Sequence, residues 1–476
     1  MGMDLSWRSL PAAVLATALL AACGTRGPSA TMPAQSVAPA SPDGSVGPAA
    51  TATAASPRPP AAFVADVERL AEDLAALQAH ADAHGGIRTA GTAGYEASVE
   101  HVAERLRDIG FAVETPEIAF TGFRDLGASL EIGEEAFRGP DELRALIYSP
   151  GGEVRGPVTV LEESGCQAAD FATVRPGDVV LTTRGGCFRR DQALNAASAG
   201  AAALLVGYPG RGPGEIFRPT LLDPAGIDLP VVSVTDDAVR LLAADDVPEV
   251  RLSVSTEFPA QTFRNVVAQL GNGPRVVMVG AHLDSVLDGP GINDNGSGVA
   301  AALEIARGAA DAGVPDGWAV RIGLWGAEEF GTIGSRAYAA SVGPELAAYL
   351  NLDMAGSVNG ATLVYDEAGA AAGSDRITAA YEAWLEARGE PFERVDIGGS
   401  SDHFGFIQAG IPTGGLFAGA SETGSASQPS APGGDGVAPD PCYHIGCDDL
   451  DNVDLDRVAL FAEATFAVVA TLMDGG

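Results

Sequence analysis

The sequence contains no lysine and has little positive charge of any kind. Its basic side chains are 28 arginines, set against 63 aspartates and glutamates, and the formal net charge is −35 at pH 7. Nucleic-acid binding requires basic patches that contact phosphates, so this balance argues against nucleic acid as a partner. A strongly negative protein instead attracts substrates that carry an ammonium group.

The start of the chain lacks an apolar run long enough to span a bilayer stably. The apolar stretch Leu10–Ala22 follows a single positive side chain, Arg8, and ends in the sequence LAAC, whose cysteine is Cys23. This ending resembles the bacterial lipobox, in which the cysteine is acylated and becomes the mature N-terminus. We therefore predict that residues 1–23 are a lipoprotein signal peptide with lipid on Cys23. Ordinary signal cleavage beside an incidental cysteine is the alternative.

Cysteine is scarce, with five in 476 residues. With Cys23 set aside for lipid, the simplest pairing of the other four is local, Cys166 with Cys187 and Cys442 with Cys447. Export to an oxidising compartment permits such disulfides. Zinc bound by thiolates is the competing interpretation, and the absence of a Cys-x-x-Cys spacing disfavours it.

The remaining chain divides by composition. Residues 24–60 are rich in Ala, Pro and Ser with almost no charge, which predicts a disordered tether. Apolar residues at helical spacing predict two helices within residues 63–110, separated by a Gly-rich turn at 84–92. Residues 119–261 read as short β-strands and turns, a separate inserted domain. Residues 63–118 and 262–476 would then form the catalytic domain.

From residue 262 onward, apolar strands alternate with amphipathic helices. Val276–Gly280 is a continuous apolar run, as expected for a strand buried on both faces, and Val320–Trp325 and Ala347–Leu352 are further strands. Helices are expected at Val299–Ala309 and Leu455–Leu472. This alternation predicts an α/β fold with a mixed, mostly parallel central sheet flanked by helices.

Five short segments in this part of the chain carry histidines and carboxylates suited to a pair of metal ions. Most follow an apolar run or lie in a Gly-rich turn, and ligand sites of open α/β sheets form beyond the carboxyl ends of strands. Imidazole and carboxylate together suit zinc. The segments are Gly280–Asp284, Gly291–Gly298, Trp325–Glu329, Asn351–Met354 and Cys442–His444.

Together these blocks resemble the secreted di-zinc aminopeptidases of bacteria and fungi, the aminopeptidase S and aminopeptidase Y type. The resemblance implies two zinc ions per chain and a water activated between them. His282 and Asp353 would be terminal ligands of one ion, Glu329 and His444 would hold the other, and Asp294 would bridge them. Glu328 would be the general base, and the Tyr443 hydroxyl would help to stabilise the tetrahedral intermediate.

Further stretches resemble parts of the same family. Gly399–Phe404 matches a family block in which some relatives carry arginine where this chain has Ser400, so an arginine contact to the substrate is not expected at this position. Ile411–Phe417 matches a stretch near the substrate pocket, although a buried strand explains it equally well. Residues 119–261 resemble a protease-associated domain, expected to cover or gate the cleft without being catalytic.

The predicted protein is therefore an exported, lipid-anchored and monomeric aminopeptidase that acts on peptides with a free N-terminus outside the cell. A related carboxypeptidase or dipeptidase, a single-zinc glutaminyl cyclase and a non-catalytic ectodomain are the alternatives. A basic group for a substrate carboxylate is not obvious among the blocks, although Arg321 and Arg336 lie close in sequence. A structural calcium is a further open question, with four candidate ligands: Asp448, Asp449, Asp451 and Asp454.

Overall fold

The computed structural model describes residues 63–244, 247, 249–367, 370–421 and 437–474. The predicted signal peptide, Cys23 and the tether lie outside these residues. Within the described part, no helix combines the length and apolar character needed to cross a membrane.

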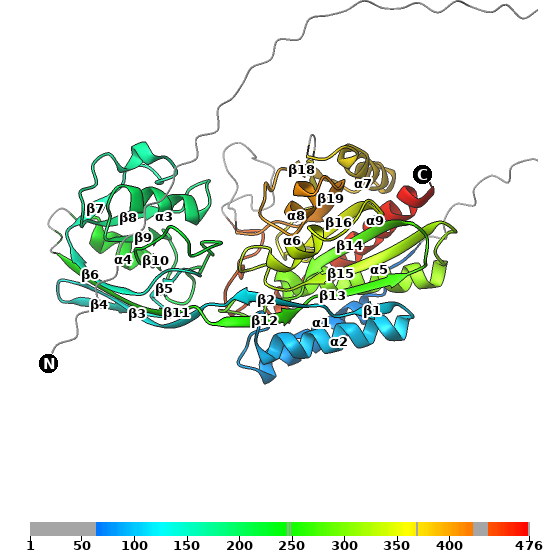
Figure 1. Ribbon diagram of the computed structural model, residues 1–476, viewed down its shortest axis with the longest axis horizontal. Coiled ribbons are helices and arrows are strands. Elements are labelled where there is room, and N and C mark those ends of the chain that lie inside the picture. Colours follow the sequence, from blue (N-terminus) through cyan, green and yellow to red (C-terminus); the bar gives the residue numbers. More distant parts are fainter. Residues whose placement is uncertain (1–62, 245–246, 248, 368–369, 422–436, 475–476) are drawn as a thin grey trace, which may run out of the picture. The chain divides into compact units, whose positions relative to one another are not determined.

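An eight-stranded mixed sheet organises the larger part of the fold (Figure 1). The strands β15, β14, β16 and β19 form a continuous parallel block, and β13 and β17 join its two sides in antiparallel fashion. The predicted strands at 276–280, 320–325 and 347–352 all lie in this block. In spatial order the strands are β1 (Ala112–Glu114), β13 (Val266–Leu270), β15 (Trp318–Trp325), β14 (Arg275–His282), β16 (Leu346–Asp353), β19 (Thr413–Phe417), β17 (Leu363–Tyr365) and β18 (Glu393–Val395).

Helices cover both faces of this sheet, as expected from the alternating pattern. Successive residues of β16 point to opposite faces of the sheet. Leu350 belongs to the main core, whereas Tyr349 stacks on Phe406 with ring centroids 3.7 Å apart. The first group of helices packs on the Leu350 face and the second on the Tyr349 face. The first comprises α1 (Val67–Ala83), α2 (Ala93–Ile109), α5 (Gly298–Ala312), α7 (Ser374–Arg388) and α9 (Leu455–Asp474); the second comprises α6 (Ile333–Ala339) and α8 (His403–Gln408).

The first two helices lie within residues 63–110, as predicted, and polar side chains cap their starts. The Asp66 side chain accepts hydrogen bonds from the amides of Glu68 and Arg69, which satisfies two free N–H groups at the start of α1. Thr92 does the same for α2 by accepting from the Tyr95 amide. At the end of α2, Gly110 adopts a φ of 107°, a left-handed conformation that costs glycine little.

A second region is built mainly of short strands. Its five-stranded sheet has the order β5-β10-β9-β8-β7, its four-stranded sheet has the order β4-β3-β11-β6, and the disulfide Cys166–Cys187 lies in its loops. The chain enters and leaves through one antiparallel ribbon, β2 (Glu117–Thr121) with β12 (Ala260–Arg264). A single entry and exit ribbon is the arrangement expected of an insertion. The boundaries at residues 119 and 261 remain predictions. The elements are β3 (Arg124–Ile132), β4 (Glu135–Arg138), β5 (Leu143–Ala145), β6 (Gly152–Gly156), β7 (Val158–Val160), β8 (Val179–Thr183), α3 (Arg189–Ser198), β9 (Ala203–Gly207), β10 (Val231–Val234), α4 (Asp236–Leu242) and β11 (Val250–Glu257).

Candidate metal centre

Three neighbouring parallel strands deliver predicted ligands to one edge of the sheet. His282 is the last residue of β14, Asp353 is the last residue of β16, and Glu329 follows the end of β15. Because β15, β14 and β16 run in the same direction side by side, their carboxyl ends meet at this edge. The apolar strand runs therefore fix where these ligands converge.

Asp294 reaches the same place from the turn Ile292–Ser297, which leads into α5. Gly291 before it has a φ of 66°, and a Cβ there would lie 2.4 Å from the Asp294 carbonyl oxygen, so only glycine fits. The buried Asp448 carboxylate accepts hydrogen bonds from the amides of Asn293 (2.8 Å) and Asp294 (3.0 Å). The turn is thus held by a side chain that lies more than 150 residues further along the chain.

The Asp294 carboxylate lies between the two predicted histidine ligands. Its Oδ1 is 3.1 Å from His282 Nε2, and its Oδ2 is 3.1 Å from His444 Nε2. Asp353 Oδ1 lies 3.4 Å from His282 Nε2, and Glu329 Oε2 lies 3.3 Å from His444 Nε2. We call His282 with Asp353 the sheet half-site and His444 with Glu329 the loop half-site.

Asp284 contacts residues of both half-sites. Its backbone oxygen lies 3.1 Å from His282 Nδ1, which leaves Nε2 of that ring for the centre. Its buried carboxylate accepts from the amides of Glu328 (3.1 Å) and Glu329 (3.4 Å). One residue therefore orients the predicted ligand His282 and fixes the backbone of the glutamate pair.

Arg88 closes the loop that separates His282 from Asp294. This arginine comes from the Gly-rich turn between α1 and α2 and is fully buried. Its guanidinium donates to three backbone oxygens, at 2.5, 3.0 and 2.6 Å, and its amide donates to the Ser285 hydroxyl at 2.8 Å. The three oxygens belong to Leu283, Pro290 and Gly291 and so lie at both ends of the loop. The sequence showed the turn but gave no signal that this side chain reaches the centre.

His444 comes from a long connection between β19 and α9. The disulfide Cys442–Cys447 encloses it, and its φ is 60°. Its ring stacks on Tyr443 with centroids 3.8 Å apart. Both predicted disulfides are thus present, and the second one restrains a residue of the centre.

Burial dominates the electrostatics of the centre. It raises the pKa of Glu328 and Glu329 well above their usual range, and it raises the pKa of Asp284 to about 6. Burial also opposes ionisation of Asp294, but hydrogen bonds from the two histidines hold the pKa of that carboxyl below its usual range. Several carboxylates therefore share a space with little positive charge, which favours binding of cations.

Two unsatisfied oxygens point to the same conclusion. Glu329 Oε1 and Asp353 Oδ1 are buried without a hydrogen-bond partner, although burying such atoms unpaired is costly. Among the described residues, the one group of three or more metal-binding side chains with ligand atoms within 4.8 Å of one another is His282, Asp294 and Glu329. The donor set, imidazole with carboxylate, fits zinc.

The proposed calcium ligands do not form such a group in the described part of the chain. Asp448 turns inward to the Asp294 turn, and Asn452 donates to it at 3.0 Å. Asp449 instead accepts from the amide of Asp451, and Asp454 from that of Arg457. These aspartates thus support the turn and cap helical segments.

The two further family stretches have different positions. Ser400 is exposed, whereas the Ser401 hydroxyl next to it donates to Asp353 Oδ2 at 2.7 Å and so belongs to the sheet half-site. Burial raises the pKa of Asp402 to about 7. Thr413–Phe417 is strand β19 within the sheet, and Leu416 on it is part of the core, as the buried-strand interpretation predicts.

Comparison with known proteins identifies the family of this chain. The family model "Peptidase family M28" matches residues 265–469, and the model "PA domain" matches residues 154–242. The "Probable lipoprotein aminopeptidase LpqL" of Mycobacterium tuberculosis is 39% identical over 414 residues, which cover 81% of this chain and 80% of that protein.

Solved structures show the same fold. An aminopeptidase from Aneurinibacillus sp. strain AM-1 is 26% identical with a TM-score of 0.65, covering 86% of this chain and 94% of the other. The zinc aminopeptidase BSAP from Bacillus subtilis is 24% identical with a TM-score of 0.66, covering 86% and 95%. At that identity the second likeness concerns the fold alone. From these matches, the chain belongs to the aminopeptidases of peptidase family M28 that carry an inserted PA domain.

Proposed function

We propose that this chain is an exported aminopeptidase that uses two zinc ions and Glu328 as general base. The observation that carries the proposal is the Asp294 carboxylate, which turns one oxygen to His282 and the other to His444, each at 3.1 Å. A carboxylate with a histidine at each oxygen and a further carboxylate beside each histidine is the donor set of two adjacent ions. When bound, two zinc ions would lower the pKa of a shared water and polarise the scissile carbonyl.

The charges of the centre support two ions better than one. Asp294, Asp353, Glu328 and Glu329 converge there, while the buried cation nearby, Arg88, donates its hydrogen bonds to backbone oxygens. Isolated carboxylates are unstable in a low dielectric unless a cation compensates them. A glutaminyl cyclase with one zinc would leave one of the two half-sites unused.

We assign the proton transfer of the proposed reaction to Glu328. Its backbone is fixed by Asp284, its side chain is half-buried, and it is the neighbour of the ligand Glu329. A general base works best when its pKa is near the working pH, and burial shifts the pKa of this carboxyl upward in that direction. Glu328 would take a proton from the attacking water and deliver it to the leaving amine. The Tyr443 hydroxyl would donate to the developing oxyanion.

The choice of the N-terminal end rests on charge and on the names of the relatives. Arg321 is not available for a substrate carboxylate, because its guanidinium donates to Gln269 and to the Tyr338 hydroxyl at 2.5–3.0 Å. Arg336 is exposed on α6. The acidic centre suits an ammonium group, and the M. tuberculosis relative is named an aminopeptidase. The carboxypeptidase and dipeptidase alternatives are therefore less well supported.

The same comparison supports a proposed location. The M. tuberculosis relative is named a lipoprotein, and this chain has LAAC ending at Cys23. We propose that lipid on Cys23 anchors the enzyme at the outer face of a membrane, where it meets peptides as a monomer. Labelling with a radioactive fatty acid in the producing cell should mark the parent and not Cys23→Ser.

The activity is tested on the full chain carrying Cys23→Ser. Aminoacyl-p-nitroanilides with a free amine should be hydrolysed, and their N-acetylated forms should not. Glu328→Gln should lower kcat by roughly 10²- to 10⁴-fold, the usual contribution of a general base, while two zinc ions remain bound. Release from N-acetylated or C-terminal substrates, or one zinc per active chain, would contradict the proposal.

A further inference from the structure

One segment of the PA domain is built to contact the metal centre. Residues 214–222, which we call the docking segment, lie between β9 and β10 without regular secondary structure. Arg144 on β5 donates to the carbonyl oxygens of Ile216 (2.7 Å) and Gly214 (3.4 Å). Ile147 exchanges backbone hydrogen bonds with Pro219 (3.1 Å) and Leu221 (3.0 Å). The docking segment is therefore fixed to the body of its own domain on both sides of residues 217 and 218.

Phe217 reaches the loop half-site directly. Its ring meets Tyr443 edge to face, with centroids 5.7 Å apart at 72°, and it meets His444 at 6.5 Å and 86°. The same ring is held on its own domain by Tyr208 at 5.2 Å and by the Arg211 guanidinium at 4.9 Å. Such aromatic pairs restrict orientation as well as burying area. The stack that presents His444 to Asp294 therefore has a support from the PA domain.

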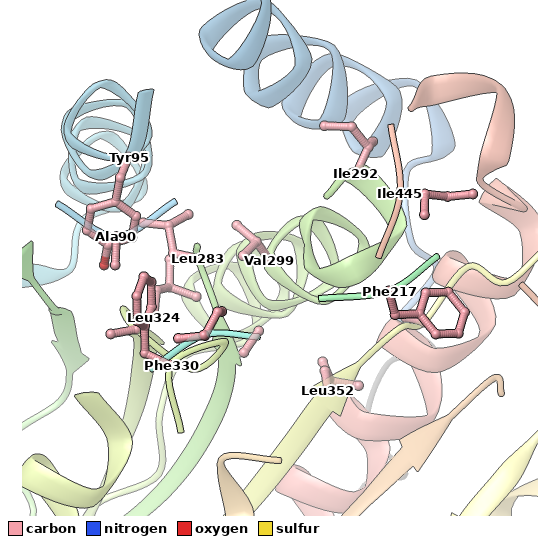
Figure 2. Close-up of a cluster of buried hydrophobic side chains, with 14 of the residues drawn as sticks. Ala90, Tyr95, Phe217, Leu283, Ile292, Val299, Leu324, Phe330, Leu352 and Ile445 are labelled. Carbon is pink, nitrogen blue, oxygen red and sulfur yellow. The ribbon is translucent and has the colours of Figure 1, made fainter. Parts of the chain in front are cut away.

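Arg218 anchors the same place by charge. Its buried guanidinium donates to Asp288 at 2.8 and 3.3 Å and to Asp125 at 2.6 Å. Asp288 precedes Gly289, where a Cβ would lie 2.4 Å from the Ile445 carbonyl oxygen, so the two turns lie against each other. In Figure 2, Phe217 and Ile445 occupy the same end of the buried cluster. Phe217 contacts His444 directly, and Arg218 binds Asp288, whose neighbour Gly289 lies against the turn that carries His444.

Hydrogen bonds hold the two ends of this turn, because Asn293 donates its side-chain amide to Asp440 at 2.6 Å and Asp448 accepts from the amides of Asn293 and Asp294. The turn lies within described residues 437–449, which form neither a helix nor a strand, and His444 at a φ of 60° is in a left-handed conformation that a non-glycine residue seldom adopts. The disulfide Cys442–Cys447 joins the two ends of the turn but not the turn to the sheet. Between these ends, the His444 imidazole contacts the Asp294 and Glu329 carboxylates through Nε2, and its ring lies against the Tyr443 and Phe217 rings.

We propose that Phe217 is a positioning residue of the loop half-site, so that the PA domain completes the metal centre as well as covering it. The inference rests on the proposed two-metal function. It assigns the inserted domain a role in holding His444 and Tyr443 in place. Loss of the Phe217 ring should weaken zinc binding at one of two sites and slow turnover without changing substrate affinity.

The test compares Phe217→Leu and Phe217→Ala with Phe171→Leu in the full chain carrying Cys23→Ser. Phe171 is a matched control, because it is equally buried in the PA domain but packs on Gly165 within that domain. Metal-free protein is titrated with zinc against a chromophoric chelator, kcat and KM are measured, and thermal unfolding is followed by circular dichroism. Arg218→Lys is a second variant if the Phe217 variants do not fold. It keeps the positive charge but loses the planar guanidinium that donates to both Asp288 and Asp125.

We expect the Phe217 variants to weaken one zinc site by about 10- to 100-fold, with Ala worse than Leu, as for other residues that orient ligands. The stronger site and KM should stay at parental values, and Phe171→Leu should change the unfolding temperature alone. Arg218→Lys should weaken the same site less. Parental zinc affinity in both Phe217 variants, or an equal loss in Phe171→Leu, would overturn the inference. If the parent protein binds two zinc ions but does not hydrolyse aminoacyl substrates, the proposed function is wrong. The zinc titration of the Phe217 variants still tests the inference in that case, because it does not depend on activity.

Discussion

The two half-sites use the same chemistry but are supported in different ways. His282 is 1% exposed and ends a strand paired on both sides, so the hydrogen bonds of the core also place the ligand. His444 is 15% exposed and lies on a turn held by a disulfide, a tyrosine and a phenylalanine of another domain. A strand-borne ligand costs little extra to position, whereas a turn-borne ligand needs dedicated contacts. The two half-sites should therefore respond differently to perturbation.

Replacing the shared ligand should remove that difference. Asp294→Asn keeps the shape but removes the negative charge between His282 and His444 and replaces one of the two carboxylate oxygens with an NH2 group. We expect loss of both zinc ions and a fall in kcat/KM of at least roughly 10³-fold, the upper range for losing a preorganised charged group. Metal analysis and steady-state kinetics measure it. Retention of one tightly bound zinc would mean that the two half-sites are independent.

Arg88 provides a test of the loop that joins His282 to the shared Asp294. Arg88→Lys leaves at least one buried carbonyl oxygen unpaired, which costs about 1–3 kcal/mol per group in unfolding free energy. Activity should fall by about 10- to 100-fold as the His282–Asp294 loop loosens. Urea unfolding and kinetics measure both effects.

Arg307→Lys is the matched control for Arg88. Arg307 is also largely buried in the same domain, where it pairs with Asp73 and Glu304 at 2.9 Å, but it does not contact the loop after β14. This variant should lose stability and keep its kcat. Equal losses of activity in both arginine variants would show that general destabilisation explains the effect.

A chelator should remove the ions of the two half-sites at different rates. The loop half-site is more exposed, and its histidine lies on a turn rather than at a strand end, so we expect its ion to leave first and at least about 10-fold faster. Activity should follow this first step. Stopped-flow mixing with a chelator, with samples taken for metal analysis, shows whether the loss occurs in one phase or two. A single phase would contradict a difference between the half-sites.

The two disulfides offer the smallest and most selective contrast. Loop-closure entropy predicts about 3 kcal/mol of stability for Cys166–Cys187, which closes the longer loop, and about 2 kcal/mol for Cys442–Cys447. Replacing both cysteines of Cys166–Cys187 with serine should therefore lower the unfolding free energy more than replacing both cysteines of Cys442–Cys447. The two double variants are compared with the parent. They should rank the opposite way in kcat, because Cys442–Cys447 alone encloses His444. The same rank in both measurements would contradict this expectation.

The sequence predicts the sheet half-site better than the loop half-site. Apolar runs end at His282 and Asp353, and parallel strands bring such ends together, so their proximity follows from the pattern. The roles of all these residues still rest on resemblance and await the variants above. His444 carries no local signal beyond its neighbouring cysteines.

Residues that support the centre from a distance are not visible in the sequence. Arg88 acts through three backbone oxygens that lie 195 to 203 positions away, and Asp448 acts through the amide of Asp294. Backbone oxygens and amides have no residue identity, so no motif marks these contacts. Phe217 is hidden for another reason, because its partners belong to a different domain and ring packing leaves no spacing pattern.

The β2–β12 ribbon has a consequence for the history and redesign of the molecule. Thr121 faces Ala260 in register, so a two-residue Asn-Gly turn would join the strands as an ordinary hairpin and excise everything between them. The PA domain is therefore a removable cassette as far as chain connectivity is concerned. A peptidase that acquired such a cassette could later come to depend on it through a single ring placed against its catalytic turn.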